Sequence, residues 1–126
     1  MLRCALLALA LSAPLAAAAQ QVQRNFPATA LRGELTVVNP PAAVLNGQPA
    51  RLAPGVRIKG GNNLLVMSGA IVGQKVKVNY TIDTYGLVKD VWLLREDEAA
   101  RSPWPKTTAE AATWSFDPIA QTWTKP

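Results

Sequence analysis

Residues 75–83, KVKVNYTID, decide the fold class of this chain. Apolar and polar side chains alternate along them, and a period of two is typical of a β-strand with one buried face. A short turn at residues 84–86 leads into a second extended stretch, residues 87–95, which is apolar on both faces. We expect Trp92 to face the core and Val91 to face outward, so another segment must cover the outside of this strand.

Shorter stretches before residue 75 continue the β-pattern. Asn46-Gly47 favours a two-residue hairpin, because both central residues of a type I′ turn need a positive φ. Residues 53–56, APGV, predict another turn, and residues 64–67 predict a short strand. Five to seven short strands with closely spaced turns predict a mainly β fold, a small OB- or SH3-like barrel formed by residues 30–95.

Residues 96–126 predict a short helical or irregular C-terminal extension that packs on the barrel. Thr107 and Glu110 have the spacing of a helix capping box, so we expect a short helix there. The extension also holds three of the four tryptophans. Trp104 lies between two prolines and is a candidate anchor for a protein partner or a sugar ring. The alternative is that these tryptophans cover the barrel, because aromatic rings bury large apolar areas.

The start of the chain has the features of an export signal. Residues 1–19 contain an early arginine, an apolar run at residues 5–11 and small residues before the expected cleavage site at Ala19-Gln20. The apolar run is too short to span a bilayer of ~30 Å, so we expect no stable membrane span after cleavage. The protein is then periplasmic or secreted, and residues 20–29 form a flexible leader.

Four segments follow one another with strand-like spacing, and their sequences are LNG (45–47), LAPGVRI (52–58), VGQKVKVNY (72–80) and GLVKDVWLL (86–94). Over residues 31–94 the chain therefore resembles small exported bacterial proteins with an OB-like barrel. The resemblance implies that one face of the barrel binds oligonucleotides or sugars. Aromatic residues that stack on such ligands are sparse, since only Tyr80 and Trp92 lie on the central strands and their phase places both in the core.

The missing residue types exclude several kinds of chemistry. The chain has no histidine, and its only cysteine, Cys4, leaves with the signal. Zinc, copper and non-haem iron sites usually need imidazole or thiolate ligands, so we expect no metal and no cofactor. Ser-His-Asp and Cys-His catalysis are excluded for the same reason. The leading prediction is a non-enzymatic binding or accessory module, whose partner is an envelope protein or a polyanion.

A cofactor-free hydrolase is the alternative from another class. A glycoside hydrolase needs two facing carboxylates ~5–9 Å apart, and Asp83 and Asp90 flank one predicted hairpin. Asp83 lies beside a turn, where an aspartate commonly accepts hydrogen bonds from backbone amides instead. Asp90 shares the strand phase of Trp92, so we expect it to point partly inward.

The charges are unevenly distributed along the chain. Residues 20–80 hold seven bases and one acid, whereas residues 81–126 hold five bases and seven acids. Such a basic half attracts a polyanion, or the two halves attract each other. Four of these bases lie on two predicted strands, and they form one basic strand face if those two strands are close neighbours: Arg57, Lys59, Lys75 and Lys77. We predict that such a face binds nucleic acid, lipopolysaccharide or an acidic glycan. The alternative is that these four basic side chains are the solvated outer surface of the barrel and bind no ligand.

Overall fold

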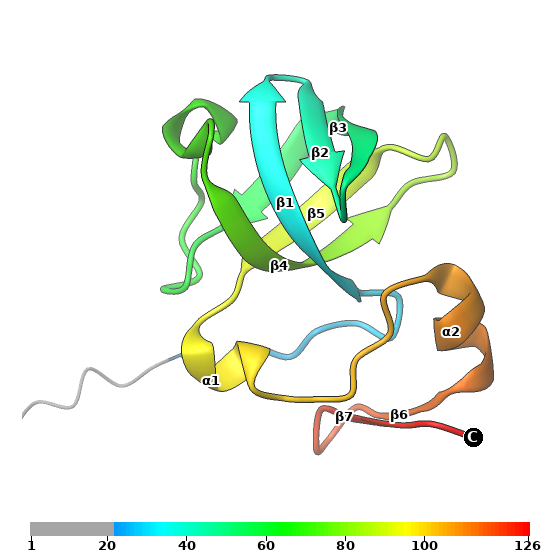
Figure 1. The fold of residues 1–126 in the computed structure, drawn as a ribbon. Coiled ribbons are helices and arrows are strands. Elements are labelled where there is room, and N and C mark those ends of the chain that lie inside the picture. The colour runs from blue at the N-terminus through cyan, green and yellow to red at the C-terminus, as the bar shows by residue number, and fades with distance from the viewer. Residues whose placement is uncertain (1–21) are drawn as a thin grey trace, which may run out of the picture.

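The computed structural model describes residues 22–126, so the predicted signal at residues 1–19 lies outside the described residues. Five strands close into a barrel in the order β1-β2-β3-β5-β4 (Figure 1). The β3–β5 pair is parallel and the other pairs are antiparallel. This confirms the predicted mainly β fold with a small OB- or SH3-like barrel. The strands are β1 (Leu31–Asn39), β2 (Ala42–Leu45), β3 (Gln48–Lys59), β4 (Lys75–Ile82) and β5 (Val88–Leu93).

The Asn-Gly hairpin forms as predicted, but two other sequence predictions are wrong. Asn46 and Gly47, with φ angles of 52° and 78°, join β2 to β3. Residues 53–56 do not end a strand, because Gly55 takes a φ of 75° and the chain stays within β3 while its register to β5 shifts. Residues 64–67 form no strand either, and Leu65 makes a single bridge to Lys59.

A bulge in β5 reverses the predicted orientation of this strand. Val88 lies opposite Ile82, while Asp90 lies opposite Thr81, so one extra residue shifts the alternation of side chains. Val91 is therefore buried in the barrel core and Trp92 points outward, the opposite of the prediction. The same shift places Asp90 on the outer face rather than partly inside. The outer face of β5 is nonetheless covered, as predicted, because the extension packs against Trp92.

The extension begins after β5 and lies along one side of the barrel (Figure 1). Thr107 Oγ1 accepts a hydrogen bond of 3.1 Å from Glu110 N and caps the second helix, as its sequence predicts. A small 3₁₀ helix, η1 (Ser68–Ile71), lies in the β3–β4 connection. The elements of the extension are α1 (Glu96–Ala99), α2 (Thr108–Thr113), β6 (Ser115–Asp117) and β7 (Thr122–Thr124).

An aromatic cluster joins the extension to the outer face of the barrel. Its buried members include Trp104, which is 5% exposed, and its indole N–H donates to the carbonyl of Ala30 at 2.9 Å. A presented anchor needs an exposed ring, so the prediction that Trp104 anchors a partner is wrong. The cluster consists of Phe26, Ala30, Trp104 and Trp123, packed against Trp92, Leu94, Ala111, Trp114 and Phe116.

The segment before β1 is not a loose leader in its described part. It runs between the barrel and the extension (Figure 1), and Phe26 is 3% exposed. Phe26 N donates to the side-chain oxygen of Gln121 at 2.8 Å. The prediction of a flexible leader overlooked Phe26, whose ring packs edge-on against both Trp92 and Trp104. Apolar burial and pairing of buried backbone groups hold this segment in place.

Two arginines from the basic half fasten the extension to the barrel. Arg24 forms a buried ion pair with Glu98 and also donates to the carbonyls of Gly60 and Leu93, at 2.8 and 2.7 Å. Arg32 donates to the carbonyls at the end of α1, including that of Arg101 at 2.6 Å. Two of the seven first-half bases thus bind groups of the second half. Part of the positive charge of the first half therefore interacts with the second half within the molecule.

Candidate anion-binding groove

The four predicted basic residues do not form one continuous face. Strand β5 lies between β3 and β4, so Arg57 and Lys59 are separated from Lys75 and Lys77 by a whole strand. Arg57 also lies opposite the acid Asp90. The shared basic face was predicted on the condition that the two strands are close neighbours, and β5 between them means that this condition is not met. The parallel β3–β5 pairing is a long-range contact that local periodicity does not reveal.

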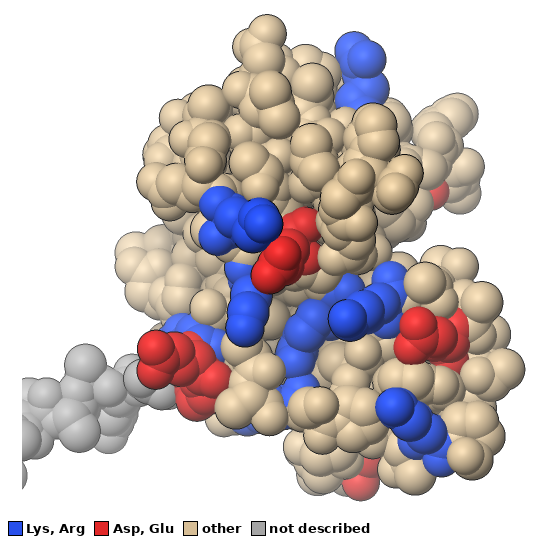
Figure 2. Space-filling view, viewed as in Figure 1, with Lys and Arg blue, Asp and Glu red and all other residues tan. Residues whose placement is uncertain are grey.

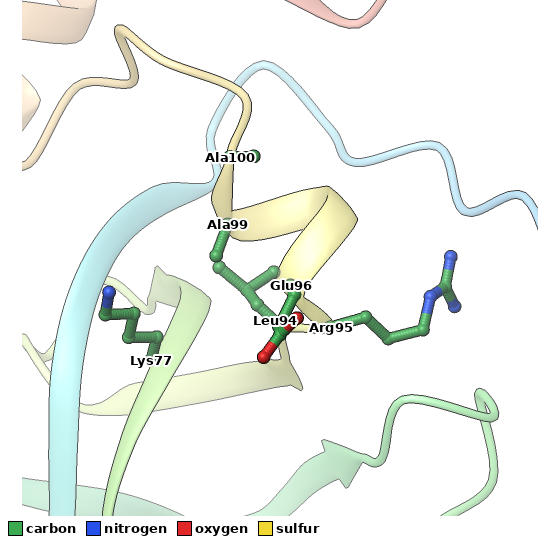
Figure 3. A pocket seen from close by; sticks show the side chains of 6 residues that line it. All are labelled: Lys77, Leu94, Arg95, Glu96, Ala99 and Ala100. Atoms are coloured by element: carbon green, nitrogen blue, oxygen red, sulfur yellow. The ribbon is translucent and has the colours of Figure 1, made fainter.

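Lys77 is the predicted basic residue that lines a hollow surface. Two hollows of about 420 and 480 Å³ share Lys77 and Ala99, and together they form a groove between the barrel and the extension. Figure 2 shows lysine and arginine side chains along the crease between these two parts. In the close view of Figure 3, Lys77 extends from β4 on the side of the hollow opposite α1, and the side chain of Arg95 runs away from the hollow. The groove residues are Arg32, Gly33, Glu34, Asn46, Lys77, Leu94, Arg95, Glu96, Ala99, Ala100 and Lys106.

Arg32 forms a fixed positive wall of the groove. Its guanidinium lies 4.8 Å above the ring of Trp104 and donates to Asn79 Oδ1 at 3.0 Å. Burial is the main cause that lowers the pKa of Arg32 to about 10; the charge of Glu98 opposes this effect and that of Arg101 adds to it. Arg32 therefore remains cationic at neutral pH but lacks full compensation by nearby acids. A bound anion would supply that compensation.

Two lysines of the groove are available to a ligand. Within residues 22–126 neither Lys77 nor Lys106 forms an ion pair, and both side chains are exposed. Arg95 is already occupied, because it donates to Asp97 and to the carbonyls of Gly61 and Val22. The mobile positive charges of the groove are thus the two lysine ammonium groups.

The groove also holds acids that restrict what it can bind. Glu34 lies directly opposite Lys77 across the β1–β4 pair, and Glu96 lines the other hollow. Lys77 and Lys106 match these two acids in number, and Arg32 and Arg95 add positive charge although their N–H groups already donate within the protein. A ligand with separated negative charges and neutral polar groups matches this pattern better than a dense row of phosphates, because the acids repel charge at two points.

The predicted carboxylate pair serves the β4–β5 hairpin. Asp83 Oδ1 accepts hydrogen bonds from the backbone N–H groups of Tyr85 and Leu87, at 2.8 and 2.9 Å. Asp90 accepts a hydrogen bond of 2.9 Å from Thr81 Oγ1 on the neighbouring strand. Asp83 therefore takes the turn-stabilising role that its position beside residues 84–86 predicted.

Sequence analysis missed most of the groove. Lys106 is more than 70 positions from Arg32 and Glu34 of β1, and it meets them only because the extension folds back onto β1 and β4. One backbone contact shows how this occurs, since Arg32 N donates to the carbonyl of Pro105 at 2.8 Å. The signal in the sequence was the uneven charge together with the rigid Pro-Trp-Pro segment. Neither feature indicated which charged residues would meet in the groove.

Among residues 22–126, no cluster of three or more histidine, cysteine, aspartate or glutamate side chains is arranged to hold a metal ion. No helix in this described range has the length and apolar character needed to cross a membrane. Comparison with protein-family models, curated proteins and solved structures finds no match to this chain.

Proposed function

We propose that this protein is a non-enzymatic binding module that holds an anionic ligand in the groove between its barrel and its extension. The observation that carries the proposal is the place of Lys77, which lines both hollows and has no ion-pair partner among the described residues. The export features of residues 1–19 support a site of action in the periplasm or outside the cell.

Electrostatics supports an anion as the ligand. Arg32 is partly desolvated and Arg101 repels it, so a negative group that enters the groove relieves an unfavourable interaction.

The shape of the groove supports an acidic glycan over a nucleic acid. The two hollows are open to solvent, and the aromatic rings beside them are packed edge-to-face within the cluster instead of being exposed for base stacking. Recognition of single strands depends on such stacking platforms. An acidic glycan instead presents carboxylates or sulfates spaced by hydroxyl groups, which suits alternating cations and acids.

The test is a titration with heparin, single-stranded DNA and lipopolysaccharide at two salt concentrations, followed by tryptophan fluorescence. Trp104 reports on the groove because Arg32 stacks on its ring. We expect heparin to bind more tightly than DNA, and Lys77→Glu to weaken heparin binding by about tenfold. Added salt should weaken the wild-type complex.

Lys89→Glu provides the matched control. Lys89 is exposed at the β5 bulge and does not line the groove, yet its reversal changes the net charge by the same amount. The proposal predicts near wild-type affinity for Lys89→Glu. Equal losses in the two variants would show that only net charge attracts the polyanion, and would refute a binding site at Lys77.

A further inference from the structure

A third hollow lies within the extension and meets the groove at Lys106. Its volume is about 320 Å³, and Lys106 lines both this hollow and the larger hollow of the groove. Lys77 joins the two hollows of the groove in the same way. Figure 2 shows basic side chains on the extension as well as along the crease. The three hollows therefore follow one another, with a lysine at each junction.

The backbone of Lys106 is fixed against the barrel. The carbonyl of Pro105 accepts a hydrogen bond of 2.8 Å from Arg32 N, and the carbonyl of Lys106 accepts one of 3.3 Å from the Tyr80 hydroxyl. Arg32 lies on β1, whereas Tyr80 lies on β4, the strand that also carries Lys77. The barrel therefore sets the position of Lys106 relative to Lys77, and the junction between the groove and the third hollow is a fixed part of the structure.

The C-terminal hairpin places a further lysine on the wall of the third hollow. Strands β6 and β7 pair with Ser115 opposite Thr124, so the residues that flank this pair, Trp114 and Lys125, face each other across the hairpin. The ammonium group of Lys125 lies 5.3 Å from the centre of the Trp114 ring. An indole face attracts a cation, so Trp114 holds the Lys125 ammonium group at the hollow.

The third hollow continues the charge pattern of the groove. Its charged lining residues are Lys106, Glu110 and Lys125, and none of them forms an ion pair within residues 22–126. Two ammonium groups are thus available to a ligand, while the carboxylate of Glu110 repels negative charge at one point. The Trp114 ring is only partly exposed and has the Lys125 ammonium group over it, so it is a poor platform for a stacked base.

We propose that the ligand of the groove is a linear acidic polysaccharide whose chain continues over Lys106 into the third hollow and reaches Lys125. This inference rests on the proposed function, because it extends the ligand of the same groove. A single sugar acid would occupy one hollow and leave the other lysines without a partner. A chain with carboxylates or sulfates at intervals pairs with Lys77, Lys106 and Lys125 together, and each linked contact strengthens the others.

Heparin fragments of two lengths test the proposal. The protein is purified in the form in which its cells hold it, and isothermal titration calorimetry measures its affinity for a tetrasaccharide and for a dodecasaccharide. We expect Lys125→Glu to weaken dodecasaccharide binding about fivefold, because an attractive contact becomes repulsive. The tetrasaccharide should bind this variant nearly as tightly as the wild type, since the groove alone offers it Lys77 and Lys106.

Lys89→Glu is again the matched control, because it changes the net charge equally at an exposed site outside all three hollows. It should leave both affinities near their wild-type values. Trp114→Leu should reproduce the length-dependent loss of Lys125→Glu, and Trp114→Phe should restore long-chain binding because a ring remains beneath the ammonium group. A purely structural role of Trp114 would instead lower the affinity for both lengths.

Failure of this inference is distinguishable from failure of the proposed function. Wild-type affinity of Lys125→Glu for the dodecasaccharide, with weaker binding by Lys77→Glu, would show that the chain ends within the groove and would overturn only the inference. Unchanged binding of both lengths by Lys77→Glu would overturn the proposed function as well. Equal losses in Lys125→Glu and Lys89→Glu would also overturn the inference, because net charge alone would then explain the attraction.

Discussion

The barrel core and the aromatic cluster are built in different ways. Aliphatic residues at alternate positions of neighbouring strands fill the barrel, among them Leu35, Val78 and Val91. The aromatic cluster collects rings from positions 26, 92, 104, 116 and 123. Most of the contacting rings pack edge-to-face, such as Phe26 and Trp104, whose centroids are 5.8 Å apart, while Phe116 and Trp123 are tilted by 32°. The barrel therefore depends on regular local alternation, whereas the cluster depends on bringing the ends of the chain together.

This difference has a consequence for the groove. The groove lies where the extension meets β1 and β4, so its shape depends on the aromatic cluster and on the two arginines that fasten the extension. Damage to the barrel should unfold the whole molecule. Damage to the cluster or its arginines should release the extension first, and with it the groove.

The largest effect is expected from Glu98→Ala. It leaves the charge of Arg24 buried without its partner, and the loss of one member of a buried ion pair costs about 3–5 kcal/mol of unfolding free energy. Urea unfolding, followed by both tryptophan fluorescence and circular dichroism, measures this loss. In the wild type we expect the two transitions to coincide, because β5 contributes to both the barrel core and the aromatic cluster.

In Glu98→Ala the fluorescence transition should precede that of circular dichroism, because the tryptophans lie in or beside the aromatic cluster. Glu96→Ala is the control, since Glu96 is exposed on the same helix, and its cost should be below about 0.5 kcal/mol. Similar losses in the two variants would show that the Arg24–Glu98 pair does not hold the extension.

A smaller effect is expected from Trp104→Phe. The substitution keeps an aromatic ring but removes the indole N–H that donates to Ala30, and the smaller ring leaves part of the space unfilled. We expect a loss of about 1–3 kcal/mol in the same unfolding experiment. Trp114→Phe is the comparison, because Trp114 is only partly buried at the edge of the cluster, and it should cost less. A larger loss for Trp114→Phe would contradict the central place of Trp104.

The smallest effect depends on pH and concerns Tyr80, a core residue of the barrel whose hydroxyl donates to the Lys106 carbonyl of the extension at 3.3 Å. Burial raises the pKa of the Tyr80 hydroxyl above that of an unfolded tyrosine, which is ~10. The folded state therefore holds this proton more tightly, and stability that is complete below pH ~10 is lost as the pH rises through the folded-state pKa. Tyr80→Phe should flatten this decline, as measured by urea unfolding at a series of pH values. Tyr85→Phe, at an exposed ring, should keep the wild-type profile.

The alternation of residues 75–83 and the Asn46-Gly47 turn were sufficient to predict the fold class, because both are local patterns. Local patterns failed where the structure depends on contacts between distant residues. The bulge in β5 reversed the orientation of Val91 and Trp92, and nothing in the alternation of residues 87–95 signals an added residue. The insertion of β5 between β3 and β4 likewise separated the predicted basic residues.

The groove was less predictable than the fold. Lys77 was among the predicted binding residues, but its partners in the groove depend on where the extension packs. Arg24 belongs to the predicted flexible leader, yet it lies buried against Glu98, which is 74 positions away. Charge counts identified an attraction between the two halves without identifying the pairs. Such pairings require the tertiary structure, because no local period links residues so far apart.

The most direct test of the groove is to map heparin oligosaccharide binding by NMR, using the backbone amide signals of the isotopically labelled protein. We predict the largest shifts at Gly33, Lys77, Ala99 and Lys106, which line the groove, and small shifts at Arg57 on the far side of β5. Saturable shifts confined to these groove residues would support the binding site. Shifts centred on β3 near Arg57, with Lys77 and Ala99 unmoved, would contradict it.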